Sequence, residues 1–235
     1  MINNQNRENF LENLYRKLDT EPSECQSHPY VPINNLPTET YADKTKDELL
    51  EICHEKIKEL NIEMTEVTEN ELENKLKDII KSFGGGSMML PTDKRFDSLK
   101  PFLEKEYKEQ ISYWQEGPEY RERNITSAEK ANIGIAFSEY LLAESGSIVV
   151  ETTSGQGRSL HFLPTHYISI IPKSKIVPRS TQAVNDYAKK IKCGEKVGSA
   201  IHIISGPSNS GDIEMQLVIG LHGPLKVHYI VVSDK

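Results

Sequence analysis

Residues 147–152 read SIVVET, and three similar runs follow: YISII at 167–171, AIHIIS at 200–205 and KVHYIVV at 226–232. Each run is short and consists mainly of β-branched or aromatic residues, which is the composition typical of strands. The runs are nearly continuous in apolar character, as expected where both faces of a strand are buried. They predict strands of a sheet that is covered on both sides.

Helical segments are expected between these strands. One spans about 181–192 and another about 211–219, so that they separate the second run from the third and the third from the fourth. A further helical stretch, 127–142, precedes the first run and ends at Glu144-Ser145-Gly146. Strands that alternate with helices favour a mainly parallel sheet. The predicted fold class is therefore α/β, with helices on both faces of the sheet.

The first half of the chain is mainly helical. Its expected elements are an amphipathic helix at 5–18, a helix at 44–60, a strand near 62–67, a helix at 70–82 and a buried strand at 87–90. Residues 20–41 contain four prolines and indicate an extended linker, whereas 93–125 give no clear pattern. We expect an N-terminal helix and proline-rich linker over residues 1–43 and one domain over residues 44–235.

Composition indicates a globular chain, with 37% hydrophobic and 27% charged residues. No apolar run approaches the roughly 18–20 residues of a membrane-spanning helix, and the first residues do not resemble a signal peptide. We therefore expect a cytoplasmic protein. Cys25, Cys53 and Cys193 lack metal or redox spacing, and an iron–sulfur cluster usually needs four thiolates. No metal or cofactor is expected to be bound by this chain alone.

Charge is distributed unevenly along the chain. Residues 1–125 contain 26 acidic and 17 basic residues, whereas residues 126–235 contain 9 and 11. The acidic half would repel nucleic acid, and no basic block interleaves with aromatic residues, so nucleic-acid binding is not predicted. A Gly-x-Ser-x-Gly nucleophile motif and a Gly-x-Gly-x-x-Gly dinucleotide motif are both absent from the sequence. The second half, where glycines and polar loops concentrate, is the expected place for chemistry.

Three polar loops border the predicted strands, at 152–158, 205–214 and 220–224. Ligands of open α/β sheets bind beyond the carboxyl ends of the strands, so we expect the three loops to converge there on one crevice. In the first loop, Gly155 and Gly157 would let backbone N–H groups approach a ligand. Arg158 offers a forked donor for carboxylate or phosphate. The alternative is a glycine-rich turn with a surface arginine.

The second loop leads into a predicted helix. Ser208, Asn209 or Ser210 would cap that helix, and Asp212 and Glu214 would lie in its first turn, near the positive end of the helix dipole. Two carboxylates at this place disfavour a phosphate cradle, and no P-loop sequence follows. The carboxylates are candidates for proton transfer or for binding a cationic group. The alternative is a well-capped helix with a solvated acidic turn.

In the third loop, His222 is framed by glycine and proline, and could donate to a carboxylate or exchange a proton near neutral pH. The alternative is a turn histidine bonded to backbone. The other histidines point to no site. His161 and His166 show no recognised zinc spacing, and His202 and His228 lie within strands, where we expect them to pack or to face solvent.

Three segments, in order, resemble the LUD domain: 143–147 (AESGS), 206–214 (GPSNSGDIE) and 220–224 (GLHGP). The resemblance covers about residues 44–233. Ser210 and Gly211 stand where the family commonly has threonine and alanine, and both replacements stay small. The resemblance implies a three-layer Rossmann-like sandwich with a mainly parallel sheet, similar to the ribose-phosphate isomerase and CoA-transferase type, preceded here by an N-terminal helical extension.

The resemblance also implies a function. LUD-domain members act with two iron–sulfur partner proteins in converting L-lactate to pyruvate, and this chain shows no redox ligand set of its own. It is therefore expected to be a component of lactate utilization that carries no redox centre and binds a small carboxylate. Glu144, Asp212 and His222 are the expected catalytic residues. The expected substrate-binding residues are Ser145, Gly146, Ser147, Gly155, Gly157, Arg158, Gly206, Ser208, Ser210, Glu214 and Gly223.

Two other functions stay open at this point. The chain could be an independent enzyme of sugar-phosphate isomerase or acyl-CoA transferase type, by analogy of fold alone. Glu144 would then be its base or nucleophile, and Ser145 and Ser147 would contact phosphate or coenzyme. Alternatively, the chain could be a non-catalytic interaction subunit, which binds its partner through the N-terminal helix and linker.

Overall fold

The computed structural model describes residues 4–20, 31–213 and 216–233, with the side chains of Asn4, 211–213 and 216–217 left out. The chain divides into two units, Met1–Asn35 and Leu36–Lys235. The first contains helix α1 (Asn4–Leu18), as predicted from its spacing of apolar residues. All other elements belong to the second unit.

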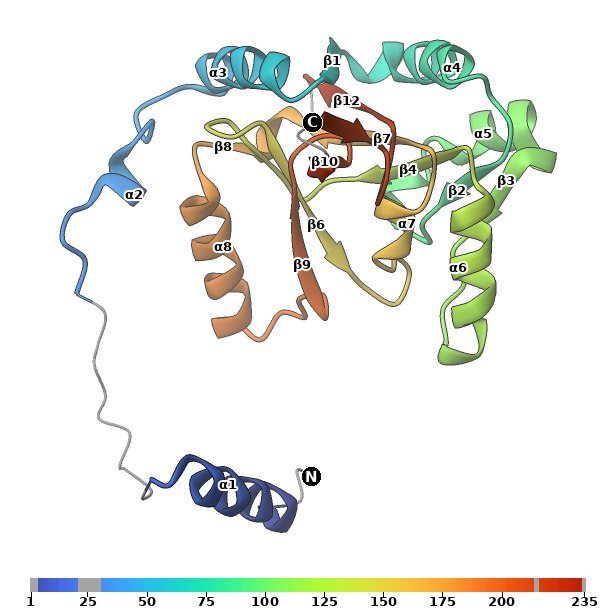
Figure 1. Ribbon diagram of the computed structural model, residues 1–235. Coiled ribbons are helices and arrows are strands. Elements are labelled where there is room, and N and C mark those ends of the chain that lie inside the picture. Colours follow the sequence, from blue (N-terminus) through green and yellow to red (C-terminus); the bar gives the residue numbers. More distant parts are fainter. Residues whose placement is uncertain (1–3, 21–30, 214–215, 234–235) are drawn as a thin grey trace. The chain divides into compact units, whose positions relative to one another are not determined.

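A six-stranded parallel sheet forms the centre of the second unit (Figure 1). Its strands, in spatial order, are β1 (Ile62–Val67), β12 (Lys226–Val232), β7 (His166–Pro172), β4 (Ile133–Phe137), β2 (Met88–Leu90) and β3 (Ile111–Tyr113). All five residues of β4 are buried, and so are the last six of β12. The parallel sheet with nearly continuous apolar strands is confirmed.

Helices cover both faces of this sheet. They are α3 (Lys46–Glu59), α4 (Leu72–Ser82), α5 (Lys100–Tyr107), α6 (Arg121–Lys130) and α7 (Ser159–Phe162). Side chains of β12 alternate between two core layers: Tyr229 packs in the layer that includes α3, and Ile230 in the layer that includes α4. Short 3₁₀ turns (69–71, 94–96, 108–110, 118–120 and 173–175) connect these elements. The mixed α/β layering predicted from the sequence is therefore present.

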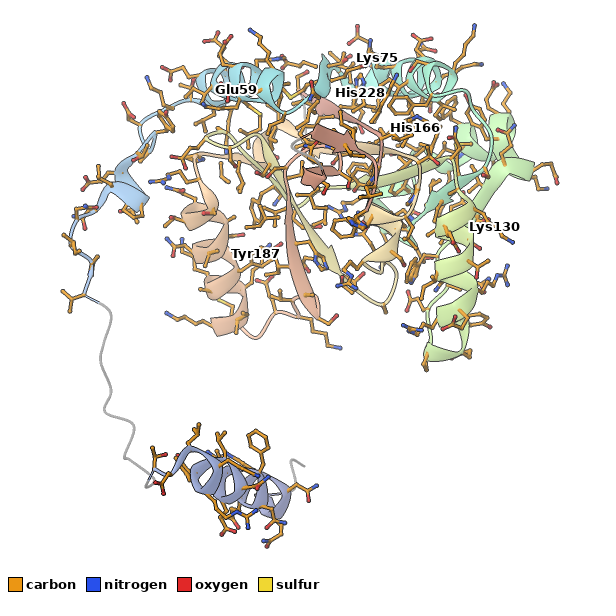
Figure 2. All side chains as sticks on the ribbon, viewed as in Figure 1. Glu59, Lys75, Lys130, His166, Tyr187 and His228 are labelled. Carbon is orange, nitrogen blue, oxygen red and sulfur yellow. The ribbon has the colours of Figure 1, made fainter. Side chains whose placement is uncertain are left out.

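A second sheet of four strands lies beside the central one. Its order is β8 (Ile176–Val177), β5 (Tyr140–Leu142), β6 (Ser147–Thr152) and β9 (Ala200–Ile204). Helix α8 (Ser180–Lys192) packs on it through Tyr187, which Figure 2 shows between α8 and the strands. The short helix α2 (Leu36–Glu39) lies near α8, since Gln182 Nε2 donates to the Thr38 carbonyl at 3.2 Å.

Two of the four runs that predicted the parallel sheet belong to this second sheet instead. The chain leaves β5, turns at Gly146, where φ is +64°, and returns as β6 in antiparallel pairing. A hairpin of this kind cannot join parallel strands. Strand β9 then pairs antiparallel with β6. Composition alone identified the strands but not the sheet to which each belongs.

The prediction of a helix over 127–142 is wrong beyond residue 130. Helix α6 ends at Lys130, and β4 and β5 follow directly. The run Ile133–Phe137 has both faces buried, so it lacks the alternation that distinguishes a strand from a short buried helix. Its tertiary environment decides its conformation.

The prediction of a helix over 211–219 is also wrong. The segment forms β10 (Asn209–Ile213) and β11 (Gln216–Ile219), an antiparallel pair with an irregularity between Ser210 and Ile213. Asn209 pairs with Ile219 in a local antiparallel hairpin, and this pairing outweighs the helix propensity of Glu, Met, Gln and Leu. Ser208, Asn209 and Ser210 therefore cap no helix there. The side chains of Asp212 and Glu214 lie outside the described residues.

The packing of α7 on β4 yields a stability prediction. A Cβ atom on Gly134 would lie 2.7 Å from the Leu160 carbonyl oxygen and 2.9 Å from Pro164 Cγ. We expect Gly134→Ala to lower the free energy of unfolding by about 1–3 kcal/mol, because the α7 backbone must move. Urea denaturation would measure this effect. Ser112→Ala, on the exposed position of β3, is the control, and an unchanged midpoint for Gly134→Ala would contradict the packing.

Candidate functional site

A cavity of about 280 Å³ lies among α7, the β9–β10 loop and the turn before β12. It is lined by His161, Phe162, Tyr167, Ile203, Ile204, Ser205, Gly206, Pro207, Ser208, Asn209, His222, Gly223, Pro224 and Val227. Two of the three predicted loops, 205–214 and 220–224, thus converge here. We call this space the histidine cavity.

The predicted place of these loops in the fold is wrong. The first of them follows β9, a strand of the second sheet, and the other precedes β12. Tyr167 and Val227, which line the cavity, are the second residues of β7 and β12. The histidine cavity therefore lies near the amino ends of the central strands, and not beyond their carboxyl ends.

Ser208 holds the two loops together. Its N–H donates to the Pro224 carbonyl at 3.0 Å, its carbonyl accepts from Gly220 N–H at 2.9 Å, and its hydroxyl accepts from His222 N–H at 3.1 Å. A Cβ on Gly223 would lie 3.1 Å from Ser208 Cβ, so glycine permits this close approach. The wall of the cavity is thus built from backbone that is already fixed by hydrogen bonds.

Gly206 is required at the other side of the same loop. Its φ is +78°, in the left-handed region that glycine adopts without strain. A Cβ there would also lie 2.8 Å from the Leu60 carbonyl oxygen. Both facts explain a glycine at this position without a ligand.

His161 is the most unusual group in the cavity. Only 1% of the residue is exposed, and its Nδ1 lies 2.8 Å from the Tyr167 hydroxyl. Its Nε2 is buried and has no hydrogen-bond partner among the described residues. Burial, and then the neighbouring His202, lower the pKa of His161 to about 3. The imidazole is therefore neutral near pH 7, and one of its buried ring nitrogens has no partner in the described part of the chain.

The turn at 143–147 reaches the cavity only indirectly. Ser145 Oγ lies 2.8 Å from Ser147 Oγ, which lies 2.6 Å from Ser205 Oγ, and Ser205 lines the cavity. Gly146 packs on Ile57, where a Cβ would lie 3.1 Å from Cγ2. These residues support the wall rather than line the cavity.

Glu144, an expected catalytic residue, lies apart from the cavity lining. Its Oε2 accepts from Arg179 Nε at 2.6 Å, and Arg179 Nη1 donates to the Leu36 carbonyl at 3.2 Å. This ion pair links the β5–β6 turn to the start of α8. Ser210 lies on β10 and is not part of the lining either.

Arg158 lies in a second, larger space of about 710 Å³. Its lining residues are Trp114, Arg121, Ile125, Arg158, Ser159, Phe162, Leu163 and His202. We call this space the arginine groove. Phe162 lines both the groove and the histidine cavity, and its ring meets His202 edge-on at 5.9 Å between centroids. Arg158 and His222 are thus in neighbouring spaces, and not in one pocket.

The glycines of the 152–158 loop serve packing. A Cβ on Gly155 would lie 2.2 Å from the Thr92 carbonyl oxygen, and one on Gly157 would lie 2.2 Å from the Trp114 ring. Thr92 N–H also donates to the Gly155 carbonyl at 2.9 Å. The loop is therefore docked on the segment after β2, and Gly157 leaves room for the indole.

Two further histidines, His166 and His228, have structural partners. His166 stacks on Phe83 with ring centroids 4.6 Å apart, and His228 Nε2 lies 3.0 Å from Thr65 Oγ1 (Figure 2). Among the described residues, no three histidine, cysteine or carboxylate side chains are grouped to hold a metal ion. Within the same part of the chain, no helix has the length and apolar character needed to cross a bilayer.

Sequence reasoning missed His161. Nothing in SLHF, the sequence of α7, distinguishes a buried site histidine from a packed one. The informative features are its burial and its vacant nitrogen, which depend on residues distant in the chain. Trp114 and His202 of the arginine groove were missed as site residues for the same reason.

The chain is similar to known proteins in both sequence and structure. The LUD domain profile matches residues 44–232. Lactate utilization protein C of Geobacillus thermodenitrificans is 42% identical, over 98% of both chains, and that of Bacillus subtilis is 38% identical, also over 98% of both. A crystal structure of a DUF162 family protein from Deinococcus radiodurans has a TM-score of 0.55 at 17% identity, covering 80% of this chain and 99% of that one.

The buried histidine predicts a pH effect on stability. The pKa of His161 is about 3 in the folded chain and near 6.5 when unfolded, so the unfolded state binds the proton first. Stability is lost as pH falls below 6.5, by about 2 kcal/mol at pH 5. Urea denaturation at pH 7 and pH 5 would measure this loss. His161→Gln should lose about 2 kcal/mol less over that interval, whereas equal losses would contradict the assignment.

Proposed function

This chain belongs to the LUD-domain family, and from that premise we propose that it serves the utilization of lactate. Its similarity to proteins named lactate utilization protein C extends over 98% of its length and 98% of theirs. We further propose that it binds a small 2-hydroxy or 2-oxo carboxylate, lactate or pyruvate, in the histidine cavity.

The vacant Nε2 of His161 carries this proposal. If the Tyr167 hydroxyl donates to Nδ1, the neutral ring carries its proton on Nε2 and can donate it to an oxygen atom of the ligand. A buried polar group without a partner costs about 1–3 kcal/mol, which a ligand oxygen at this place would offset. The hydroxyl or keto oxygen beside the lactate or pyruvate carboxylate suits such a donor.

His222 is the candidate for proton exchange. A pKa of about 3 makes His161 a poor proton acceptor at neutral pH, so its role is to orient and polarise. His222 also lines the cavity but is exposed to solvent, and its backbone is fixed by Ser208. An exposed imidazole can pass a proton from the ligand hydroxyl to water.

Lactate oxidation also needs an electron acceptor. Conversion of the C2–H and O–H bonds of lactate to the C=O bond of pyruvate releases two electrons and two protons. We propose, from the family resemblance, that iron–sulfur partner proteins accept the electrons and that this chain supplies substrate binding. The isomerase or transferase alternative is less well supported, because Glu144 pairs with Arg179 outside the cavity lining.

Calorimetric titration with L-lactate and with pyruvate would test the binding proposal. We expect saturable binding, and we expect His161→Phe to weaken it about tenfold or more, because the ring shape stays while Nε2 is lost. His54→Gln, on α3, serves as the control and should bind as the unchanged chain does. Tyr167→Phe should weaken binding less, since it removes only the group that orients the imidazole.

Two outcomes would count against this function. One is the absence of any heat of binding with either acid at millimolar concentration. The other is a rise in melting temperature with ribose 5-phosphate or acetyl-CoA but with neither acid, which would favour the isomerase or transferase alternative. Growth on lactate after removal of the gene would test the cellular role separately.

A further inference from the structure

We propose that the arginine groove binds a nucleotide, with its aromatic ring between Trp114 and Phe162 and its phosphate on Arg158. This inference goes beyond lactate binding and concerns a different set of side chains. Only Phe162 is shared between the two spaces. The two proposals can therefore fail independently.

The apolar part of the groove suits a planar ring. Trp114 is half-buried, and its Cζ2 and Cη2 atoms occupy the space where a Gly157 side chain would stand, so the indole packs against the backbone of Gly157. Phe162 is held edge-on against His202. Ile125 and Leu163 complete the apolar lining. Stacking of a base on an aromatic side chain is worth about 1–3 kcal/mol.

The charged part of the groove suits a phosphate. Arg121 and Arg158 are its charged lining residues, and the lining includes no carboxylate. Arg158 has no ion pair and no side-chain hydrogen bond with any described residue, whereas Arg121 pairs only with its exposed neighbour Glu122 at 2.5 Å. A vacant guanidinium presents a planar fork that matches phosphate oxygens. The groove is thus a positively charged site on a chain whose net charge is −7.

The volume of the groove favours a nucleotide over lactate. A space of about 710 Å³ lies within the range of about 300–1,000 Å³ typical of sites for drug-sized ligands, and a three-carbon acid would leave most of it empty. Helices α6 and α7 contact each other, and the groove is lined by residues of both helices and by Trp114, which follows β3. A nucleotide there would lie next to the histidine cavity, with Phe162 between the two ligands.

The single tryptophan of the chain lines this groove, so its fluorescence reports on the site directly. We expect AMP to quench Trp114 fluorescence saturably, and adenosine to bind at least tenfold more weakly, because it lacks the phosphate. Arg158→Gln should raise the Kd for AMP about tenfold and leave that for adenosine unchanged. Arg123→Gln, an exposed arginine on α6 outside the lining, is the matched control and should leave both unchanged.

Further ligands define the nucleotide class. ATP, NAD⁺, FMN and coenzyme A share a ring and a phosphate, and calorimetry with each would show which is bound most tightly. Trp114→Ala should weaken the preferred nucleotide in the same measurement. The proposal is overturned if no nucleotide binds at millimolar concentration, if Arg158→Gln binds AMP as the unchanged chain does, or if pyrophosphate alone binds as tightly as AMP.

Discussion

The close packing of α7 against the central strand β4 determines where both candidate sites lie. A side chain at position 134 would clash with the Leu160 carbonyl. Because residue 134 is glycine, the α7 backbone packs directly on the sheet. Arg158 immediately precedes α7, and His161 and Phe162 belong to it. One helix of four residues thus contributes to the arginine groove and to the histidine cavity. A larger residue at 134 would shift lining residues of both spaces together.

The same packing explains why His161 is neutral. The helix places the imidazole above Tyr167, whose hydroxyl partners Nδ1, and Tyr167 pairs in register with Gly134 on the neighbouring strand. The close approach of α7 at Gly134 therefore brings His161 within hydrogen-bond distance of Tyr167 on the adjacent strand. Burial then disfavours the charged form of the ring, while Ser208 fixes the opposite wall. A polar group in an otherwise apolar layer costs stability, and a ligand would offset part of that cost.

Sequence patterns predicted the helices and strands correctly where local composition and burial favour the same conformation. The strands at 167–171 and 226–232 and the helix at 181–192 lie as predicted, because each is either buried on both faces or amphipathic with a helical period. The patterns failed at 127–142, where β4 pairs with the distant strand β7, and at 211–219, where a local antiparallel hairpin forms instead of a helix. For the site, two loops converged as predicted. Glu144 did not join them, because Arg179, 35 residues later, pairs with it.

The histidine cavity and the arginine groove offer different electrostatic environments to their two ligands. A small acid in the histidine cavity would contact neutral or weakly polar groups, whereas an anion in the arginine groove would meet a permanent cation. His202 lines the arginine groove, and burial, and then the charge of Arg158, lower its pKa. A phosphate on Arg158 would screen that charge and make His202 easier to protonate. Occupancy of the groove would thereby alter the electrostatics beside the histidine cavity without any movement of the backbone.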